Sequence, residues 1–288
     1  MKVSIIILDF EKSTRVVKNV ESIFRQKTNL DFEIVIAVNR ATAQKKRELE
    51  PLRINPRDTL PAGRQVSGDN NPRVELIFNK ENLGYPRGVN EAVKNSSGEI
   101  LFIVNPDIMW RDENALAKLV NFLERNPKIG VLAPQQRNDS DGKTAQTIRA
   151  FPKLALQIAR RTWLRRLPGI RKRVEFDEMR HLDFSKIQKV DWLQSSFWVV
   201  RRDLWEELSG LDERFFLFMS DPDFCWRVWN SGKEVIYFPE AVVAADGIRC
   251  SAGGFLTFFK KWTLRQHLRD AWKYRLKYFW QKNPRKQK

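Results

Sequence analysis

A short polar turn connects an apolar segment of this chain to an aspartate. Leu101–Val104 is wholly apolar and leads through Asn105 and Pro106 to Asp107. The ring of Pro106 restricts φ, so it limits the directions in which Asp107 can point. Open parallel sheets bind ligands just beyond the carboxyl ends of their strands. Asn-Pro-Asp is also an ordinary turn sequence. We therefore treat Asp107 as a candidate ligand-binding carboxylate. Whether this assignment is favoured over an ordinary turn depends on the neighbouring motifs.

Apolar strands and amphipathic helices alternate around this aspartate. Val3–Leu8 is apolar and β-branched, as expected of a parallel strand covered on both faces, and a helix with an apolar stripe should follow from about Ser13. The same patterns predict strands over Phe32–Val38, Val74–Phe78, Glu99–Val104, Val190–Val200 and Val235–Phe238, and helices from near Pro86 and over Glu113–Arg125, Asp203–Leu208 and Pro222–Trp229. This order predicts an α/β fold with a doubly wound, mostly parallel sheet.

The composition limits the classes of protein to consider. The chain has 288 residues, 42% of them hydrophobic, and its 52 Lys and Arg against 35 Asp and Glu give a net charge of +17. Such a charge favours an anionic partner: nucleic acid, a phosphate-bearing ligand or a membrane surface. The chain has only two cysteines and two histidines, so we expect neither a disulfide framework nor a zinc site built from Cys and His. Because no apolar run approaches the roughly 20 residues of a membrane span, we expect a cytoplasmic protein, free or bound to a membrane face.

The pattern also divides the chain into parts. We expect one catalytic-type domain over residues 1–254, with a nucleotide-binding half over about 1–134 and a second half over about 135–254. A Pro, Gly, Asn and Arg-rich stretch over about 50–72 lacks helical or strand periodicity and is interpreted as a surface insertion. Residues 255–288 alternate aromatic and basic residues and form a predicted helical tail.

Four short stretches in this order resemble family 2 glycosyltransferases, particularly bacterial rhamnosyltransferase-like members. They are Asn82-Leu83-Gly84-Tyr85, Asn105-Pro106-Asp107, the segment from Asp191-Trp192, and Phe215 to Arg227 with Ser220-Asp221-Pro222-Asp223 at its centre. The resemblance runs from Val3 to about Ser251, interrupted by the insertion. It implies a GT-A fold and an inverting transfer of a sugar, rhamnose or another hexose, from a nucleotide-diphosphate donor to a glycan or lipid-linked acceptor in cell-surface polysaccharide synthesis.

The resemblance also implies roles for three acids. Asp107 matches the last acid of the family's metal motif and is the predicted ligand of Mg²⁺ or Mn²⁺, with Asp246 as a second oxygen ligand. Asp221 matches the family's catalytic Asp and is the candidate general base that takes the proton of the acceptor hydroxyl. An ordinary Asp, with a pKa of about 3.9, is ionised at neutral pH. We expect Asp107 and Asp221 to face each other across one cleft.

Further residues match the donor and acceptor sides of the family's site. Five of them have a structural alternative: Asp9 can cap the following helix, Gly84 can simply end a loop, Trp192 can be core, and Asp223 and Arg227 can pair with each other across one helical turn. The donor-side residues are Asp9, Asn39, Asn82, Gly84, Asn90 and Asn105, and the acceptor-side residues are Trp192, Ser195, Ser196, Asp223 and Arg227.

Three positions depart from the family's pattern. Val38 stands where an Asp usually holds the nucleoside, Ser220 where a Glu precedes the catalytic Asp, and Ala245 where a metal-binding His is expected. These departures support a rival hypothesis, in which the chain is a catalytically degenerate GT-A scaffold that binds glycan or partners an active transferase.

The tail has three interpretations. Trp262, Leu264, Leu268, Trp272 and Leu276 fall at helical steps, and Arg265, Arg269, Lys273 and Lys277 form a cationic row. A cationic amphipathic helix on an anionic membrane, on its inner face, accounts best for this pattern. Alternatively, the aromatic side chains pack onto the catalytic domain and the charges are merely solvated. The third interpretation is that the tail binds nucleic acid. It is supported only by the positive charge and the aromatic residues, because the sequence contains no recognised nucleic-acid-binding motif.

Overall fold

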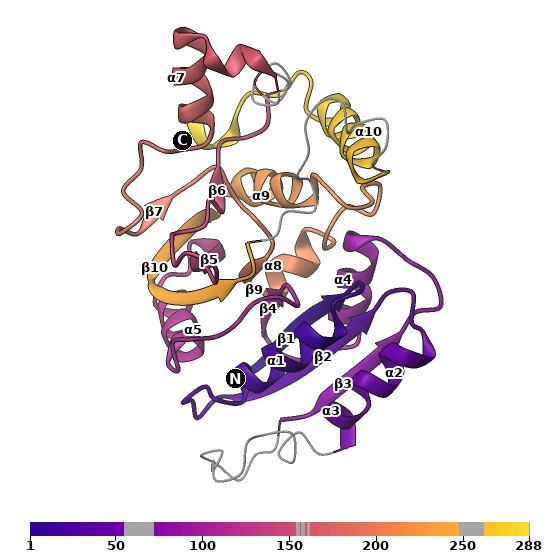
Figure 1. Cartoon of the computed structure of the whole chain (residues 1–288). Helices are drawn as coiled ribbons and strands as arrows, with labels where there is room; N and C mark the ends of the chain where they lie inside the picture. Colours follow the sequence, from indigo (N-terminus) through magenta and orange to yellow (C-terminus); the bar gives the residue numbers. More distant parts are fainter. Residues whose placement is uncertain (55–71, 154–155, 157–158, 160–161, 248–261, 288) are drawn as a thin grey trace.

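The computed structural model describes residues 1–54, 72–153, 156, 159, 162–247 and 262–287. Within these residues eight strands form one sheet in the order β3-β2-β1-β4-β9-β5-β10-β7 (Figure 1). Its strands are β1 Lys2–Asp9, β2 Asp31–Val38, β3 Val74–Phe78, β4 Ile100–Val104, β5 Ile129–Asn138, β7 Gln188–Lys189, β9 Phe197–Arg201 and β10 Glu234–Ala245. A separate pair joins β6 Ile148–Arg149 to β8 Trp192–Leu193.

The sheet is mostly parallel with one reversed strand at its centre. β2, β1 and β4 run parallel, β9 runs antiparallel to both β4 and β5, and β10 is parallel to β5. All five residues of β4 are buried, which explains why its sequence lacks polar alternation. The doubly wound, mostly parallel arrangement predicted from the sequence is confirmed, with β9 and β7 as antiparallel additions.

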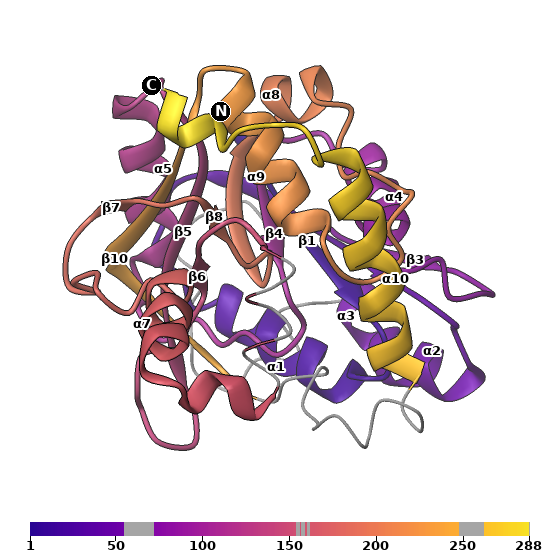
Figure 2. The same ribbon diagram turned by 90° about the horizontal axis from the view of Figure 1, so that it is seen from above.

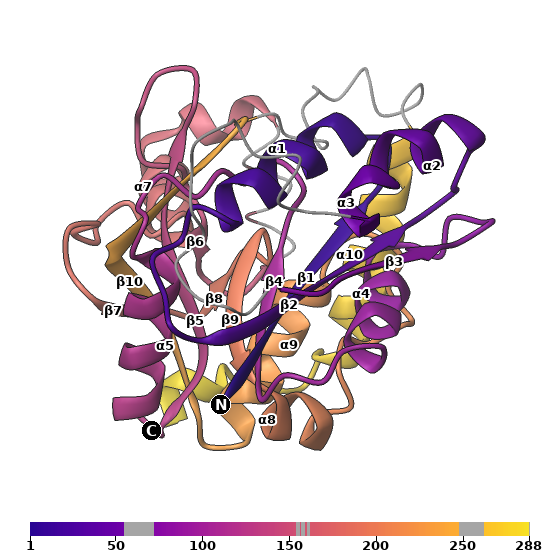
Figure 3. The same ribbon diagram turned by 90° about the horizontal axis from the view of Figure 1, so that it is seen from below.

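Helices cover both faces of the sheet. They are α1 Ser13–Ile23, α2 Ala43–Leu49, α3 Pro51–Ile54, α4 Tyr85–Lys94, α5 Ala115–Arg125, α7 Pro168–Asp177, α8 Arg202–Glu207, α9 Ser220–Asn230 and α10 Trp262–Lys277, with short 3-10 turns η1 Trp163–Arg166 and η3 Pro284–Gln287. One core joins α1 and α5 to alternate residues of the strands, and the second joins α4, α8, α9 and α10 to the others. Figure 2 shows α9 and α10 on one side, and Figure 3 shows α1 on the other.

Several predictions of elements need correction. The predicted strand Val190–Val200 is two short strands, β8 and β9, separated by Gln194–Ser196. The ten-residue strand β5 and the helices α2 and α7 were not predicted. The predicted insertion over about 50–72 begins with the short helix α3, and its residues 55–71 lie outside the described residues. Among the described residues, no helix is long and apolar enough to cross a bilayer.

Candidate active site

The polar residues singled out in the sequence meet at one edge of the sheet. Asp9 ends β1, and β2 ends one residue before Asn39, while Asn105 follows β4 and Asp246 follows β10. Because these strands are mutually parallel within the sheet, their carboxyl ends lie at the same edge. β9 is antiparallel, so the residues just before it, Ser195 and Ser196, come to this edge as well.

Two carboxylates at this edge share one ammonium group. The Lys12 Nζ lies 3.5 Å from Asp107 Oδ1 and 2.9 Å from Asp246 Oδ2. A backbone bridge between Met109 and Ala244 holds the two acidic segments together. Burial raises the pKa of Asp107, the adjacent Asp246 carboxyl raises this pKa further, and the charge of Lys12 opposes both effects. The edge thus carries two close acids that require a cation between them.

These residues fit a divalent cation. Mg²⁺ binds through one or two protein carboxylates together with water and substrate phosphates, and here an ammonium already takes the cation position between two carboxylates. Within the described part of the chain, no group of three or more His, Cys, Asp or Glu side chains forms a complete metal cage. An ion held by Asp107 and Asp246 would therefore need oxygen ligands from a bound diphosphate or from water.

Asp9 caps the first helix. Its carboxylate accepts hydrogen bonds from the backbone N–H of Lys12 at 2.8 Å and from the Ser13 hydroxyl at 2.9 Å. Its side chain is fully buried, and burial raises its pKa despite these hydrogen bonds. The capping alternative therefore accounts for Asp9, and donor contact through this side chain stays a prediction.

Asn39, Asn82 and Gly84 form one hydrogen-bonded loop. The Asn39 amide donates to Asn82 Oδ1 at 3.2 Å and to the Gly84 carbonyl at 3.1 Å, and Asn82 Oδ1 also accepts from the Gly84 N–H. Gly84 has φ +80, and a Cβ there would lie 2.4 Å from the Phe216 carbonyl oxygen. Only glycine meets both constraints. Val38, the nearby departure, is a fully buried core residue.

The two other predicted donor residues have structural partners. The Asn90 side chain donates to the Leu211 carbonyl at 2.8 Å and accepts from the Leu211 N–H at 2.9 Å, so it fastens α4 to the loop after α8. The Asn105 backbone N–H donates to the Ser196 carbonyl, and its carbonyl accepts from the Asn19 amide. These contacts explain both residues without a ligand.

Asp221 lies in the first turn of α9 and is partly exposed. Burial raises its pKa to about 6, although hydrogen bonds from its own backbone and from that of Ser195, and the positive charge of Arg149, favour the ionised form. The preceding Met219 has φ +68, a conformation that is unfavourable for a non-glycine residue. A partly desolvated carboxylate with a pKa just below neutrality suits a general base.

One short segment joins the two acidic centres. Ser195 contacts Asp221 through its backbone, and the next carbonyl, that of Ser196, accepts from the N–H of Asn105, two residues before Asp107. The Tyr85 hydroxyl donates to the Ser195 carbonyl at 2.9 Å, which brings the Asn82–Tyr85 stretch to the same point. Asp107 is 9% exposed and Asp221 is partly exposed, so neither is sealed in the core. That they face each other across one cleft stays a prediction.

The acceptor-side predictions fare unevenly. Ser195 contacts Asp221, and the Ser196 hydroxyl exchanges hydrogen bonds with the Gln136 amide at 2.8 and 3.0 Å. The Trp192 indole N–H donates to the Ala150 carbonyl at 2.7 Å, and its side chain belongs to the second core, as its structural alternative proposed.

The structural alternative accounts for Asp223 and Arg227, which pair with each other at 2.9 Å, and their acceptor-side role stays a prediction. Asp223 has no exposed surface and accepts hydrogen bonds from Arg227, Lys277 and the Tyr278 hydroxyl. Arg227 also donates to the carbonyls of Leu208 and Gly210. Both side chains therefore connect α9 to its surroundings; Asp223 is fully buried, whereas Arg227 keeps 20% of its side chain exposed.

Four residues near the site were missed by sequence reasoning: Lys12, Tyr85, Arg149 and Asp270. Asp270 is fully buried, and its carboxylate accepts from the backbone N–H groups of Phe216, Leu217 and Phe218 at 3.0–3.3 Å. It thereby fixes the loop that precedes Asp221. As the one acid in the basic tail it did carry a signal, because an acid placed alone among cations often has a structural role.

A family model described as Glycosyl transferase family 2 matches residues 4–208. The match includes Asp107 and the loop of Asn82 and Gly84, and it ends before Asp221 and Asp246. The roles considered for those two acids therefore rest on the motif resemblance and on the geometry above.

Curated relatives are rhamnosyltransferases. N-acetylglucosaminyl-diphospho-decaprenol L-rhamnosyltransferase of Mycobacterium tuberculosis is 29% identical over 187 residues, which cover 60% of this chain and 58% of that protein. Rhamnosyltransferase WbbL of Escherichia coli is 24% identical over 186 residues, 65% of each protein. The chain thus spans less than two thirds of the length of these relatives.

Solved structures share the fold. A mannosyltransferase from Pyrobaculum calidifontis, in complex with GDP-Man and Mn²⁺, covers 86% of this chain and 58% of its own with a TM-score of 0.58 and 16% identity. TarS of S. aureus in complex with UDP-GlcNAc covers 85% of this chain and 58% of its own with a TM-score of 0.56 and 15% identity. The likeness confirms the predicted GT-A fold. The family model spans well over half of the sequence, and the chain belongs to glycosyl transferase family 2.

Proposed function

We propose that this protein is an inverting glycosyltransferase that moves a hexose, L-rhamnose in our leading version, from a nucleoside-diphosphate sugar to a lipid-linked saccharide. The observation that carries the proposal is the pairing of two acidic centres by the segment Ser195–Ser196: Asp107 and Asp246 around one cation position, and Asp221 with a pKa of about 6. Membership of family 2 and the two rhamnosyltransferase relatives support the reaction class, the sugar and the acceptor.

The proposed chemistry assigns each centre one task. Asp221 takes the proton of an acceptor hydroxyl while its oxygen bonds to the anomeric carbon, and the bond from that carbon to the donor diphosphate breaks. A divalent cation, Mg²⁺ or Mn²⁺, supplies positive charge to the departing diphosphate when bound. Asp107 and Asp246 would hold this ion. Asn39, Asn82 and Gly84 shape the loop in which the donor is proposed to lie.

The scaffold alternative is less well supported. It requires the catalytic acid to be idle, yet Asp221 keeps partial exposure and hydrogen-bonding partners that favour its ionised form. The three departures from the family pattern that favoured this alternative are Val38, Ser220 and Ala245. All three are buried, and each is followed directly by a polar residue of the candidate site. The proposed division of the chain is a domain over residues 1–254 and a tail over residues 255–288.

We further propose that α10 binds an anionic membrane and that the protein works at the inner face of the cell membrane. One side of this helix is buried against the catalytic domain through Leu264, Asp270, Ala271 and Tyr274. The opposite side exposes large apolar side chains, Trp262, Leu268, Trp272 and Leu276, beside the exposed cations Arg265, Arg269 and Lys273. The combination suits a lipid surface with negative charge.

The packing interpretation of the tail accounts for several other side chains. Leu264 was expected in the exposed apolar row but is 2% exposed. Lys277, expected in the cationic row, pairs with Asp212 at 2.6 Å and with the buried Asp223. The aromatic side chains of Tyr274 and Tyr278 pack onto Trp226 of α9.

The test is a transfer assay with a panel of nucleoside-diphosphate sugars, including L-rhamnose donors, a prenyl-diphosphate-linked N-acetylglucosamine acceptor, and Mg²⁺ or Mn²⁺. Removing a general base costs about 10²- to 10⁴-fold in rate, so Asp221→Asn should lose transfer by that factor. Its melting temperature should not fall at pH 7.5, because the substitution removes a charge that burial disfavours. Transfer by Asp221→Asn at the wild-type rate, or no transfer and no nucleotide binding by the wild type, would contradict the proposal.

A further inference from the structure

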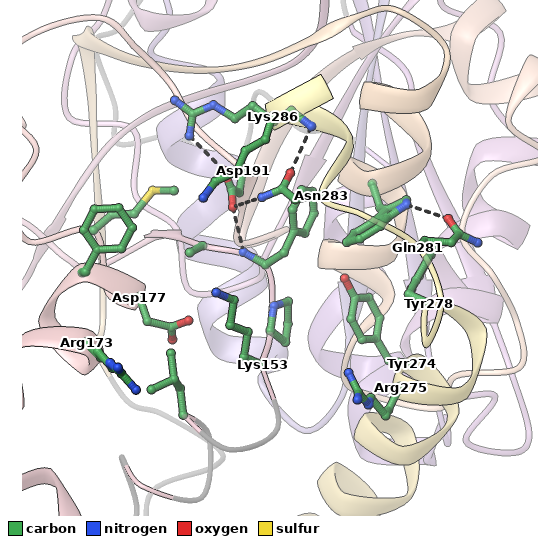
Figure 4. A pocket seen from close by; sticks show the side chains of 18 of the residues that line it. Lys153, Arg173, Asp177, Asp191, Tyr274, Arg275, Tyr278, Gln281, Asn283 and Lys286 are labelled. Carbon is green, nitrogen blue, oxygen red and sulfur yellow. Dashed lines mark hydrogen bonds and ion pairs between the residues drawn. The ribbon is translucent and has the colours of Figure 1, made fainter. Parts of the chain in front are cut away.

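A cavity of about 300 Å³ lies beside α9, the helix that carries Asp221. Its walls come from the loop Ala150–Lys153, from α7, from α9 through Trp226, and from the C-terminal segment from Ala271 to Lys286. Figure 4 shows Lys153, Arg173 and Asp177 on one side of the cavity and Tyr274, Arg275 and Tyr278 on the other. None of the residues assigned above to the donor or metal site lines it.

Cations dominate the cavity wall. Five Lys or Arg residues line it against two acids, Asp177 and Asp191. Asp191 is already neutralised, because its carboxylate accepts from Arg285 at 2.9 Å and from Asn283 at 3.1 Å. Within the described residues, no ion pair includes Lys153, Arg173 or Arg275, all of which line the cavity, and the Arg275 guanidinium lies over the Phe279 ring at 4.6 Å. The wall therefore favours an anionic ligand.

One polar atom in the wall has no partner. Tyr274 is 4% exposed, and its hydroxyl has no hydrogen-bond partner among the described residues. In Figure 4 this hydroxyl points into the cavity. Buried hydroxyls are nearly always paired, and an unpaired one costs stability. A ligand that hydrogen-bonds to Tyr274 would remove that cost.

The rest of the wall suits a sugar ring. Phe151 and Trp226 lie with ring centroids 4.7 Å apart, and Trp226 also packs on Tyr278 at 4.5 Å. Aromatic faces with polar groups at their edges are typical of sites that hold small polar ligands in a fixed orientation. The Trp226 indole N–H is already bound to Gln281 at 3.1 Å, which fixes this ring.

The cavity is close to the candidate base. Trp226 follows Asp221 by five residues on α9, a rise of about 7 Å along the helix. Ala150, in the wall, directly follows Arg149, whose charge acts on Asp221. On its other side the cavity reaches α7 and α10, and α10 carries the proposed membrane surface. A ligand in this cavity would thus lie between the proposed membrane surface and the base.

We propose that this cavity binds the phosphosaccharide end of the acceptor: a sugar attached to a phosphate or diphosphate, with the sugar on the aromatic residues and the phosphate among the cations. The inference rests on the proposed function and adds the site that recognises the acceptor. Tyr274 is assigned as a hydrogen-bond donor to this ligand, and Arg173 and Arg275 as its charge partners.

The experiment measures binding of N-acetylglucosamine 1-phosphate to the full chain by calorimetry, without donor. Loss of one hydrogen bond typically costs about five- to tenfold in affinity, so Tyr274→Phe should weaken binding by that factor. Its melting temperature should stay equal or rise, because the unpaired hydroxyl is removed. Arg173→Gln/Arg275→Gln should weaken binding by at least about tenfold, since it removes two charge-assisted contacts.

A matched tyrosine provides the control. Tyr237 lies outside the cavity, and its hydroxyl contacts Gln135 and the Phe184 carbonyl at 3.2 and 3.3 Å. Tyr237→Phe should therefore lower the melting temperature and leave ligand affinity unchanged. If Tyr274→Phe instead behaves like Tyr237→Phe, the unpaired hydroxyl is not a ligand contact and the proposal is overturned.

Two further arms separate the sources of phosphate. Inorganic phosphate and free N-acetylglucosamine should each bind more weakly than the phosphosugar; equal binding of inorganic phosphate would overturn the saccharide part. Vesicles with anionic lipid should bind Tyr274→Phe as well as they bind the wild type, because Tyr274 is buried. If the wild type transfers sugar but the cavity variants bind the phosphosugar normally, this inference fails while the proposed function stands. A wild type without transfer activity would instead refute the function itself.

Discussion

A carboxylate that acts as a base must be ionised when the acceptor arrives. Burial raises the pKa of Asp221 to about 6 from the usual value near 3.8. The ionised fraction of Asp221 should therefore fall as pH drops through about 6, two pH units above the range in which an exposed aspartate loses its charge.

The transfer rate should follow this titration. We expect kcat/KM to be level above about pH 7 and to fall tenfold per pH unit below about pH 6, measured between pH 5 and 8 at constant ionic strength. Arg149→Gln should move the midpoint to higher pH, because the Arg149 charge lowers the pKa of Asp221. A rate that stays constant down to pH 5 in the wild type would show that Asp221 is not the titrating base.

Lys12 gives a second prediction at the scale of single residues. Its ammonium pairs with both Asp107 and Asp246, so Lys12→Met should leave two neighbouring carboxylates without their cation and lower the melting temperature. Mn²⁺ without nucleotide should restore most of that loss in the variant and change the wild type little.

Lys118→Met is the matched control for Lys12. Lys118 pairs with a single aspartate, Asp112, at 2.8 Å, whereas Lys12 pairs with two. The Lys118 side chain is also 44% exposed. The Lys118→Met variant should therefore keep the wild-type melting temperature, and Mn²⁺ should not change that temperature. If Mn²⁺ fails to stabilise Lys12→Met, the cation site at Asp107 and Asp246 is refuted.

At the scale of elements, the start of α4 and the loop before α9 depend on each other. The Tyr85 N–H donates to the Phe216 carbonyl at 2.7 Å, and Asp270 of α10 holds the N–H groups on the same loop. A change at either partner should disturb both the donor loop and the position of Asp221.

Gly84→Ala tests this coupling. The new Cβ would lie 2.4 Å from the Phe216 carbonyl oxygen, and φ +80 disfavours alanine. We expect a loss of more than about 1 kcal/mol in the free energy of unfolding together with weaker nucleotide binding. Gly142→Ala separates the two causes, since φ is +64 there but nothing lies within 4 Å of the added Cβ. It should show only the smaller backbone cost, as measured by denaturant titration. Equal losses in both variants would rule out the steric contact.

The sequence predicted elements wherever one pattern ran long enough. β1, β2 and β3 appear at or within one residue of their predicted bounds, and α1 begins at the predicted Ser13, because a mostly apolar run or an apolar stripe specifies each of them. β5 was missed, since Pro134 and two glutamines follow directly after its short apolar run Ile129–Ala133, although all of these residues are buried. The break between β8 and β9 depends on contacts from Asn105 and Tyr85, which no local pattern contains.

The candidate site was predictable only in part, for the same reason. Asp107 and Asp221 were identified from motifs, whereas Asp223, two residues after Asp221 in the same first turn of α9, is buried by a tail some 50 residues later. Whether a side chain faces solvent or core is decided by tertiary packing. The motif alone therefore could not show that Asp223 holds Lys277 and Tyr278.

At the scale of the whole molecule, exposed apolar and basic residues gather at one end. Figures 1 and 2 show α7 and α10 at the same end of the molecule. Trp163, Leu167 and Phe176 are exposed in and around η1 and α7, and Trp272 and Leu276 are exposed on α10. The net charge of +17 adds long-range attraction to any anionic surface. This end is the side that we propose meets the membrane, with the phosphosaccharide cavity between its two helices.

Vesicle binding tests this orientation. The wild type should co-sediment with vesicles containing anionic lipid, less so as salt rises, and weakly with neutral vesicles. Trp272→Ser/Leu276→Ser should reduce binding about tenfold or more, because both side chains are about 60% exposed and available to enter the interface. Phe10→Ser/Ile187→Ser removes two exposed apolar side chains outside η1, α7 and α10, each 42% exposed, and should bind like the wild type. Equal losses in the two double variants would mean that general apolar exposure, rather than the α10 surface, drives binding.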